Sequence, residues 1–239
     1  MSQGLSFGPA AELYDRIRPT YPPAALEWAL GPAPLRVLDL GAGTGILTRV
    51  VRALGHDVVP VEPDAAMRER LSQATPGITA LAGRAEEIPV PDRSVDAVVA
   101  GQAYHWFDQE PAHREIARVL RSGGVFAPIW NIRDETVPWV AEVSRIADGA
   151  EAPGGGVYDG WIEHEFGPGF DPIERALFPH EVQMNADLLV QLIASRSYYI
   201  TAAPQRQGQL EAEVRELAAG LPATFALPYV TVTYRSRRR

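Results

Sequence analysis

The segment Leu35–Gly45, LRVLDLGAGTG, constrains the fold of this chain more than any other segment. An apolar run of strand type leads into the acidic Asp39, and a turn with glycine at every second position follows, at Gly41, Gly43 and Gly45. Residues 46–51 then have the composition of the first turns of a helix. Glycine allows backbone angles that a Cβ forbids and lets a ligand approach the main chain. A strand, a glycine turn and a helix N-terminus together predict a site where a ligand contacts bare backbone.

Strands and helices alternate over the rest of the first half of the chain. We expect further strands at 58–61, 78–81, 95–100 and 125–130, separated by segments that include helices at 65–74 and 109–121. This alternation is typical of βαβ units, which build a parallel sheet. Ligands of such sheets bind at the carboxyl ends of the strands. The polar residues that follow these strands therefore become candidate site residues.

The two ends of the chain add shorter elements to this α/β pattern. Helices are expected at 9–18, 24–30, 137–147, 186–195 and 209–219, and strands at 179–184 and 230–234. The 239 residues are long enough for one large domain with a sizeable core. We expect a single domain over 1–239, in which 1–34 form a helical lid, 35–133 a cofactor-binding half and 134–239 a substrate-side half with a cap insertion.

Composition excludes several classes of function. The net charge of −8 argues against a general nucleic-acid binder, and the absence of cysteine excludes disulfides and thiolate metal sites. No metal is expected, because the adjacent residues Glu163–Glu165 lack the spacing of a ligand set. The chain shows no signal peptide or membrane-length apolar run, so we expect a cytoplasmic protein. The basic residues Arg235–Arg239 are interpreted as a frayed, solvated terminus.

The spacing of the glycines bears on which ligand binds. A dinucleotide fingerprint needs G-x-G-x-x-G, whereas this chain has G-x-G-x-G and places Ile46 where the third glycine would fall. Glu62 follows about 20 residues after Gly41, where a carboxylate accepts hydrogen bonds from ribose hydroxyls. A ligand with a ribose and no pyrophosphate, such as S-adenosylmethionine, fits this pattern. A nicotinamide dinucleotide, and a structural turn followed by a solvated glutamate, remain alternatives.

Several motifs resemble those of the class I S-adenosylmethionine-dependent methyltransferases. VLDLGAGTG is similar to the first motif of that family, VVPVEPDAAM to its acidic second motif, and AGRAEEIPVPDRSVDAVVAGQAYHWFD to the third and fourth. The likeness is strongest to the methyltransferase type 11 group with trans-aconitate methyltransferase-like proteins, through Tyr14–Pro22, Gln102–Asp108, Trp130–Asp134 and Ser195–Tyr198. It implies a Rossmann-like, doubly wound, mostly parallel seven-stranded sheet of order 3-2-1-4-5-7-6, with the last strand antiparallel and a small helical cap.

The same resemblance implies a set of cofactor-binding residues. Gly41, Ala42 and Gly43 would line the methionine portion, Asp39 would hold the turn, and Thr44 is a further cofactor-binding candidate. Glu62 would bind the ribose, Pro63 and Met67 would flank the adenine, and Ala85 and Glu86 would bound it. Gln102 and Ala103 would offer backbone groups near the sulfonium, and Tyr14, Arg18 and Tyr21 would form a lid. Arg18 would pair with the cofactor carboxylate.

The remaining candidates concern the methyl acceptor. His105 is either a general base or a structural histidine, and we favour the structural role. The tentative substrate residues are aromatic or cationic: Tyr104, Trp106, Trp130, Arg133, Arg196 and Tyr198. The alternative is that the aromatic residues belong to the core and that the arginines are ordinary surface residues.

The expected activity is transfer of a methyl group from S-adenosylmethionine to a small-molecule acceptor by in-line displacement, with S-adenosylhomocysteine as product. Carboxylate and hydroxyl acceptors are the leading candidates, and a carboxylate needs no base. A non-catalytic S-adenosylmethionine-binding protein is the alternative, followed by a nicotinamide-dependent oxidoreductase. We expect no nucleic-acid or membrane partner and a monomer or homodimer.

Overall fold

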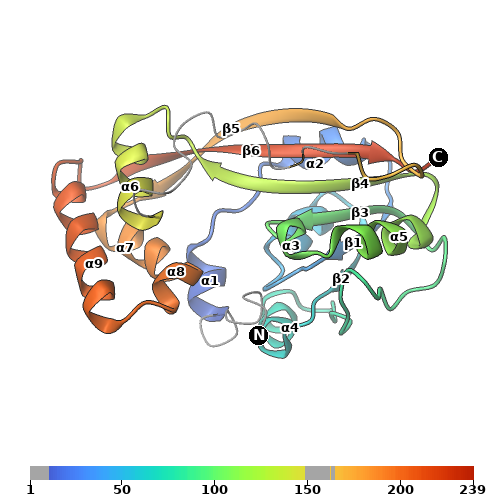
Figure 1. Ribbon diagram of the computed structural model, residues 1–239, viewed down its shortest axis with the longest axis horizontal. Coiled ribbons are helices and arrows are strands. Elements are labelled where there is room, and N and C mark those ends of the chain that lie inside the picture. Colours follow the sequence, from blue (N-terminus) through green and yellow to red (C-terminus); the bar gives the residue numbers. More distant parts are fainter. Residues whose placement is uncertain (1–10, 149–161, 163–164) are drawn as a thin grey trace. The chain divides into compact units, whose positions relative to one another are not determined.

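The computed structural model describes residues 11–148, 162 and 165–239 (Figure 1). Tertiary contacts divide the chain into two compact units, which we describe one at a time. Unit 1 contains the described residues 11–19, 132–148 and 179–230, and unit 2 contains 20–131, 162, 165–178 and 231–239. The division of one domain into a lid and two halves stays a prediction, and part of the expected lid, 1–10, lies outside the described residues.

The described residues form a six-stranded sheet of order β2-β1-β3-β4-β6-β5. Its strands are β1 (Arg36–Leu40), β2 (Asp57–Val61), β3 (Val95–Gly101), β4 (Leu120–Arg133), β5 (Glu174–Met184) and β6 (Phe225–Arg237). The first four pair in parallel, with Val37 opposite Val58 and Ala97. The apolar residues of β1 are buried on both faces, as in parallel sheets covered on both sides.

The predicted fold class is confirmed, with one strand fewer than expected. The expected strand at 78–81 does not form, because Leu81 pairs with Val61 through a single isolated bridge. Two backbone hydrogen bonds, from Leu81 to Pro60 and from Glu62 to Leu81, are all that join it to β2. Without this edge segment, the expected order 3-2-1-4-5-7-6 becomes the order observed.

The helices of unit 2 flank the parallel strands (Figure 1). They are α2 (Pro23–Leu30), α3 (Ile46–Ala53), α4 (Ala65–Ala74), the short η3 (Tyr104–Trp106) and α5 (Gln109–Val119). The α3 helix buries Leu47 and Val51, one turn apart, and these join a core that also contains Leu26, Val37 and Val99. The burial of this helical stripe keeps the start of α3 close behind the glycine turn.

Unit 1 is mainly helical. It contains α1 (Ala11–Ile17), α6 (Pro138–Asp148), α7 (Ala186–Ala194), α8 (Ser197–Ile200) and α9 (Pro204–Ala219). The α7 helix begins where the Asn185 side chain accepts a hydrogen bond from the Leu188 N–H at 2.9 Å. Fully buried Val140, Leu189 and Val214 form its core with Tyr229.

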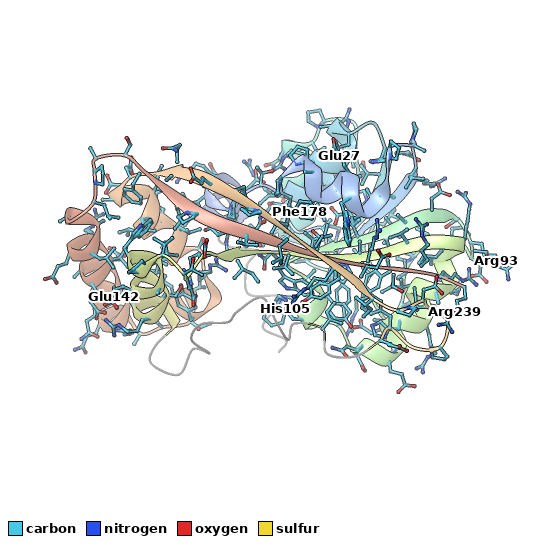
Figure 2. The ribbon with its side chains drawn as sticks, turned by 90° about the horizontal axis from the view of Figure 1, so that it is seen from above. Glu27, Arg93, His105, Glu142, Phe178 and Arg239 are labelled. Carbon is cyan, nitrogen blue, oxygen red and sulfur yellow. The ribbon has the colours of Figure 1, made fainter. Side chains whose placement is uncertain are left out.

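The C-terminal strand corrects one expectation. Residues Arg235–Arg239 do not form a frayed terminus, since β6 continues to Arg237 and runs antiparallel to β4. Arg235 forms a 2.8 Å ion pair with Glu174, and its guanidinium lies 4.1 Å above the Trp28 ring. Arg239, labelled in Figure 2, donates to Asp171 at 3.1 Å. These contacts hold the arginines against the rest of unit 2.

Within the described ranges, the helices are too short or too polar to cross a membrane.

Candidate functional site

The glycine turn, Gly41–Gly45, holds its three glycines in conformations that other residues rarely adopt. The angle φ is 72° at Gly41, 56° at Gly43 and 85° at Gly45. A Cβ at Gly41 would lie 2.7 Å from the Ala103 Cβ, and one at Gly45 would lie 2.8 Å from Cγ of Leu71. At Gly43, a Cβ would meet no atom of the described residues within 4 Å. The turn is therefore packed at both ends and open at its middle residue.

Glu62 follows β2 and lies beside the middle of this turn. Its Oε2 accepts a hydrogen bond from the Gly43 N–H at 2.9 Å, and its Oε1 accepts one from the Asp64 N–H at 2.8 Å. Only 6% of the residue is exposed. Burial raises the pKa of Glu62, and the two backbone hydrogen bonds oppose that rise. Each carboxylate oxygen can still accept a further hydrogen bond.

Asp39 lies beneath the turn and is fully buried. Its Oδ2 accepts a 2.6 Å hydrogen bond from the Thr48 hydroxyl, whereas its Oδ1 has no hydrogen-bond partner among the described residues. Burial raises the pKa of Asp39 to about 7, and the nearby charge of Glu62 adds to this rise. The buried Thr44 hydroxyl also lacks a partner in the described part of the chain. The turn thus has unused polar groups at its base.

Asp39 should make the stability of the protein depend on pH. The folded-state pKa of about 7 lies above the ordinary aspartate value of 3.8, so the folded state binds this proton more tightly than the unfolded state. The free energy of unfolding should therefore fall as the pH rises from about 4 to about 7, between the unfolded and the folded pKa. Thermal unfolding followed across this range should show a clearly flatter profile for Asp39→Asn, with a residual slope from Glu62. An unchanged slope in this variant would contradict the assignment.

The predicted adenine-side residues lie around the ends of β2 and the segment bridged to it. They are Pro63, Met67, Ala85 and Glu86. Met67 and Ala85 are buried, and Pro63 is exposed. The Glu62 N–H donates to the Leu81 carbonyl at 3.0 Å, and Oε1 of Glu86 accepts from the Asp108 N–H at 2.9 Å. The first bond holds Leu81 beside the acidic end of β2, and the second joins Glu86 to the segment that follows η3.

Gln102 is strained at the end of β3. Its φ of 55° is left-handed, which is uncommon for a residue with a side chain. The backbone N–H donates to the Ile129 carbonyl at 2.9 Å, and the side-chain Nε2 donates to the Asn131 carbonyl at 2.7 Å. These two bonds stabilise the turn that sets Ala103 against Gly41. Strain held in this way often accompanies a functional site.

His105, labelled in Figure 2, lies on η3 between two tryptophans. The Trp130 indole N–H approaches the His105 Nδ1 at a long 3.4 Å, and the Trp106 ring lies 4.7 Å from the imidazole, centre to centre. Desolvation lowers the pKa of His105 to about 4, although the residue as a whole is exposed to solvent. Because an indole N–H only donates, the neutral imidazole carries its proton on Nε2. His105 is thus arranged as a neutral hydrogen-bond donor.

Tyr104 lies in the aromatic core of unit 2. Its hydroxyl lies 2.9 Å from the His113 Nε2, and its ring packs edge-on against Phe107 and Phe166. Burial raises the pKa of Tyr104 to about 12. Trp130 is also buried, with 1% exposed, whereas Trp106 is 41% exposed. Of Tyr104, Trp106 and Trp130, Trp106 is the one that is exposed to solvent.

The predicted lid and substrate residues divide between the two units. Tyr21 belongs to unit 2, where a Cβ at Gly101 would lie 2.6 Å from its hydroxyl. The others belong to unit 1 and are described there alone: Tyr14, Arg18, Arg133, Arg196 and Tyr198. Within unit 1, Arg18 stacks on Tyr14 and donates to the Ser195 carbonyl. Arg133 is buried, with 8% exposed.

Sequence reasoning missed two residues that shape the site. Thr48 donates to Asp39, and Asp64 both donates its N–H to Glu62 and caps α4 by accepting from the Met67 N–H at 2.9 Å. The cap was visible in the sequence, because Asp precedes a helical run at 65–74. Thr48 had no comparable signal.

The described residues contain no cluster of three or more His, Cys, Asp or Glu side chains that could hold a metal ion. Of the Glu163–Glu165 segment considered above, positions 163 and 164 fall outside the described residues.

Comparison with known proteins identifies the family. A methyltransferase domain model matches residues 38–127. An uncharacterized methyltransferase of Mycobacterium tuberculosis is 44% identical over 237 residues, which cover 97% of this chain and 95% of that relative. A malonyl-[acyl-carrier protein] O-methyltransferase of Methylococcus capsulatus is 36% identical over 141 residues, 52% of this chain and 49% of the relative.

The fold agrees with these relatives. The solved structure of a proposed type II methyltransferase from Anaeromyxobacter dehalogenans has a TM-score of 0.66 to this chain and is 24% identical, covering 92% of this chain and 97% of its own. The chain belongs to the class I S-adenosylmethionine-dependent methyltransferases. Its likeness to the mycobacterial methyltransferase extends over nearly its whole length.

Proposed function

We propose that this methyltransferase acts on a small molecule and transfers the methyl group to an oxygen, with a carboxylate as the favoured acceptor. When bound, S-adenosylmethionine supplies an electrophilic methyl group, which the acceptor oxygen attacks in line with the departing sulfur. Reactions of this kind depend on alignment and exclusion of water more than on proton transfer. The residues of the chain then act mainly by holding and orienting the cofactor and the acceptor.

The observation that supports binding of S-adenosylmethionine is the fixed carboxylate of Glu62. The N–H groups of Gly43 and Asp64 each hold one of its oxygens, so the carboxylate is oriented before any ligand arrives. The remaining lone pairs suit the two hydroxyls of a ribose. We assign the ribose of the cofactor to this residue.

The glycine turn fits the methionine portion of the cofactor. Gly43 leaves open space where a side chain would stand, and the buried Thr44 hydroxyl has a hydrogen bond to give. Asp39 supports the turn from beneath through Thr48. Under this assignment the methionine portion contacts Gly41, Ala42, Gly43 and Thr44.

The remaining cofactor contacts follow from the surroundings of Glu62. Buried Met67 and Ala85 offer apolar surface to the adenine, flanked by Pro63 and Glu86. The strained turn at Gln102 and Ala103 places backbone groups next to Gly41, and we assign these to the sulfonium end. The roles of Tyr14, Arg18 and Tyr21 as a lid remain part of the proposal.

His105 favours a carboxylate over a hydroxyl acceptor. With a pKa lowered to about 4 and its proton on Nε2, the imidazole is a poor base for removing a hydroxyl proton. A carboxylate is already ionised at neutral pH and needs no base. One relative, the Methylococcus capsulatus enzyme, is named for methylation at oxygen.

Two measurements test this function. S-adenosylhomocysteine should bind the protein in calorimetric titration, while NADH should not. Incubation of small acids, phenols and alcohols with S-adenosylmethionine carrying a labelled methyl group should then give a labelled product by mass spectrometry, with the acids methylated most rapidly.

Two different outcomes would contradict catalysis and the choice of acceptor, respectively. Tight binding of S-adenosylhomocysteine without turnover on any acceptor would favour a non-catalytic cofactor-binding protein. Methylation restricted to alcohols, with acids unreactive, would overturn the preference for a carboxylate.

A further inference from the structure

The loop before β3 carries Ala85 and Glu86, two of the residues assigned to the adenine. Residues 82–94 are all described, and they contain one isolated bridge, between Arg84 and Glu87, but no helix or strand. The Glu87 N–H donates to the Arg84 carbonyl at 3.2 Å, so Ala85 and Glu86 occupy the middle of a turn. The backbone groups of such a loop need hydrogen-bond partners from elsewhere in the chain.

Two side chains of α5, Glu115 and Arg118, supply such partners. The Ile88 N–H donates to Oε2 of Glu115 at 2.9 Å, and the Ile88 carbonyl accepts from Nη2 of Arg118 at 2.8 Å. The Val90 carbonyl and the Asp92 carboxylate accept from Nη1 of Arg118, at 3.0 and 2.7 Å. Arg118 also donates to both Glu115 oxygens, at 2.7 and 2.8 Å. One guanidinium thus ties the loop from Ile88 to Asp92 to the helix.

The ion pair between these two side chains is partly exposed. The side chain of Arg118 is 31% exposed and that of Glu115 is 22% exposed, so water screens their attraction and the pair by itself adds little to stability. Their bonds to the backbone of the loop are of a stronger kind, because one partner in each is ionised. The hydrogen bonds from Arg118 also keep the pKa of Glu115 below its ordinary value, so this carboxylate stays ionised. The pair therefore acts mainly on the loop.

The other side of the turn packs beside β2. A Cβ at Gly83 would lie 2.5 Å from Cδ of Pro89 and 3.0 Å from Cγ1 of Val61. Gly83 is therefore close both to the proline that follows Ile88 and to the residue that precedes Glu62. Because Glu115 and Arg118 hold Ile88, they also fix where the loop returns toward the carboxylate assigned to the ribose.

We propose that Glu115 and Arg118 are positioning residues for the adenine of the cofactor. They hold Ile88, so the turn of Ala85 and Glu86 meets the base in one conformation and the loop does not have to be ordered when the cofactor binds. Both residues act through the loop and not by contact with the cofactor. The inference rests on the proposed cofactor site and adds to it two residues of α5.

Hydrogen exchange of the full chain tests this anchor before any ligand is added. In Arg118→Met, peptides that cover 84–93 should exchange their amide hydrogens faster than in the wild type. The control is Arg114→Met, which removes an exposed arginine of the same helix that pairs with Glu110 and should leave this exchange unchanged. Unchanged exchange in Arg118→Met would overturn the inference. Exchange that is equally faster in α3 would show a general loss of stability and would overturn it too.

Calorimetric titration with S-adenosylhomocysteine, well below the unfolding temperature, tests the effect on the cofactor. Arg118→Met should bind about three- to tenfold more weakly than the wild type, because the loop must now be ordered on binding. Glu115→Gln keeps an acceptor oxygen for the Ile88 N–H and should lose less affinity, while Arg114→Met should bind normally. Circular dichroism and thermal unfolding establish that each variant is folded.

Hydrogen exchange with the ligand bound completes the test. S-adenosylhomocysteine should slow exchange over 84–93, and the slowing should be larger in Arg118→Met than in the wild type, since a looser loop becomes ordered. Wild-type affinity in Arg118→Met, or binding that leaves exchange of the loop unchanged, overturns the inference while the proposed function stands. A wild type that does not bind S-adenosylhomocysteine contradicts the proposed function itself, and the adenine assignment fails with it.

Discussion

Replacing Glu62 with alanine is expected to weaken cofactor binding by about 1–3 kcal/mol, because hydrogen bonds between ribose hydroxyls and a buried carboxylate are lost. The change also leaves the N–H groups of Gly43 and Asp64, which now donate to Glu62, without their acceptor. Titration with S-adenosylhomocysteine should therefore show a dissociation constant that is larger by about 5- to 150-fold.

Two further variants make this result specific. Glu62→Gln keeps an acceptor oxygen but removes the charge, so it should lie between the wild type and Glu62→Ala. Glu87→Ala removes an exposed carboxylate of the same unit and should bind the cofactor normally. Wild-type affinity in Glu62→Ala would refute the ribose assignment.

Replacing Gly41 with alanine is expected to cause a large loss of stability. The new methyl group would lie 2.7 Å from the Ala103 Cβ, closer than two carbon atoms can pack. The left-handed φ of 72° adds a cost of about 1–2 kcal/mol for a residue with a side chain. The total should exceed this strain alone, and denaturant unfolding measures it.

Gly77→Ala provides the matched control for backbone strain. Gly77 has a similar φ of 83°, but a Cβ there would meet none of the described atoms within 4 Å. This variant should lose about 1–2 kcal/mol from strain and keep its affinity for the cofactor. Equal losses of stability in the two variants would show that the approach of Ala103 to Gly41 has no energetic effect.

The parallel strands were predictable because their signal is local. The apolar run in β1 and the similar runs in β2 and β3 are long enough to be buried on both faces, and each is followed by a polar residue or glycine. The edge segment at 78–81 has the composition of a strand but lacks a second neighbour, and only Leu81 pairs. The strand β5 begins at Glu174, before the expected start at Pro179. Its early residues are exposed or only partly buried, and a proline inside a strand is tolerated here because β5 is an edge strand.

The candidate site was likewise predictable only where its residues lie close together in the sequence. Glu62 and the glycine turn lie in one βαβ unit, so their spacing indicates that they come together. The contact between Arg18 and Ser195 joins residues 177 positions apart, and that between Asn131 and Thr231 joins residues 100 apart. Nothing in the local pattern pairs them. Because such contacts arise from packing of distant elements, these pairings could not be predicted from sequence.

The two N–H groups that hold Glu62 have a consequence for selectivity among cofactor analogues. A carboxylate fixed at both oxygens cannot rotate to follow an altered sugar. Under the ribose assignment, a 2′-deoxy analogue would therefore lose a hydrogen bond to the charged Glu62 carboxylate, and no rearrangement of that carboxylate would compensate for the loss. Analogues in which a larger alkyl group replaces the methyl leave this anchor untouched. The chain should thus discriminate strictly at the sugar, whereas Glu62 sets no limit on the alkyl group at sulfur.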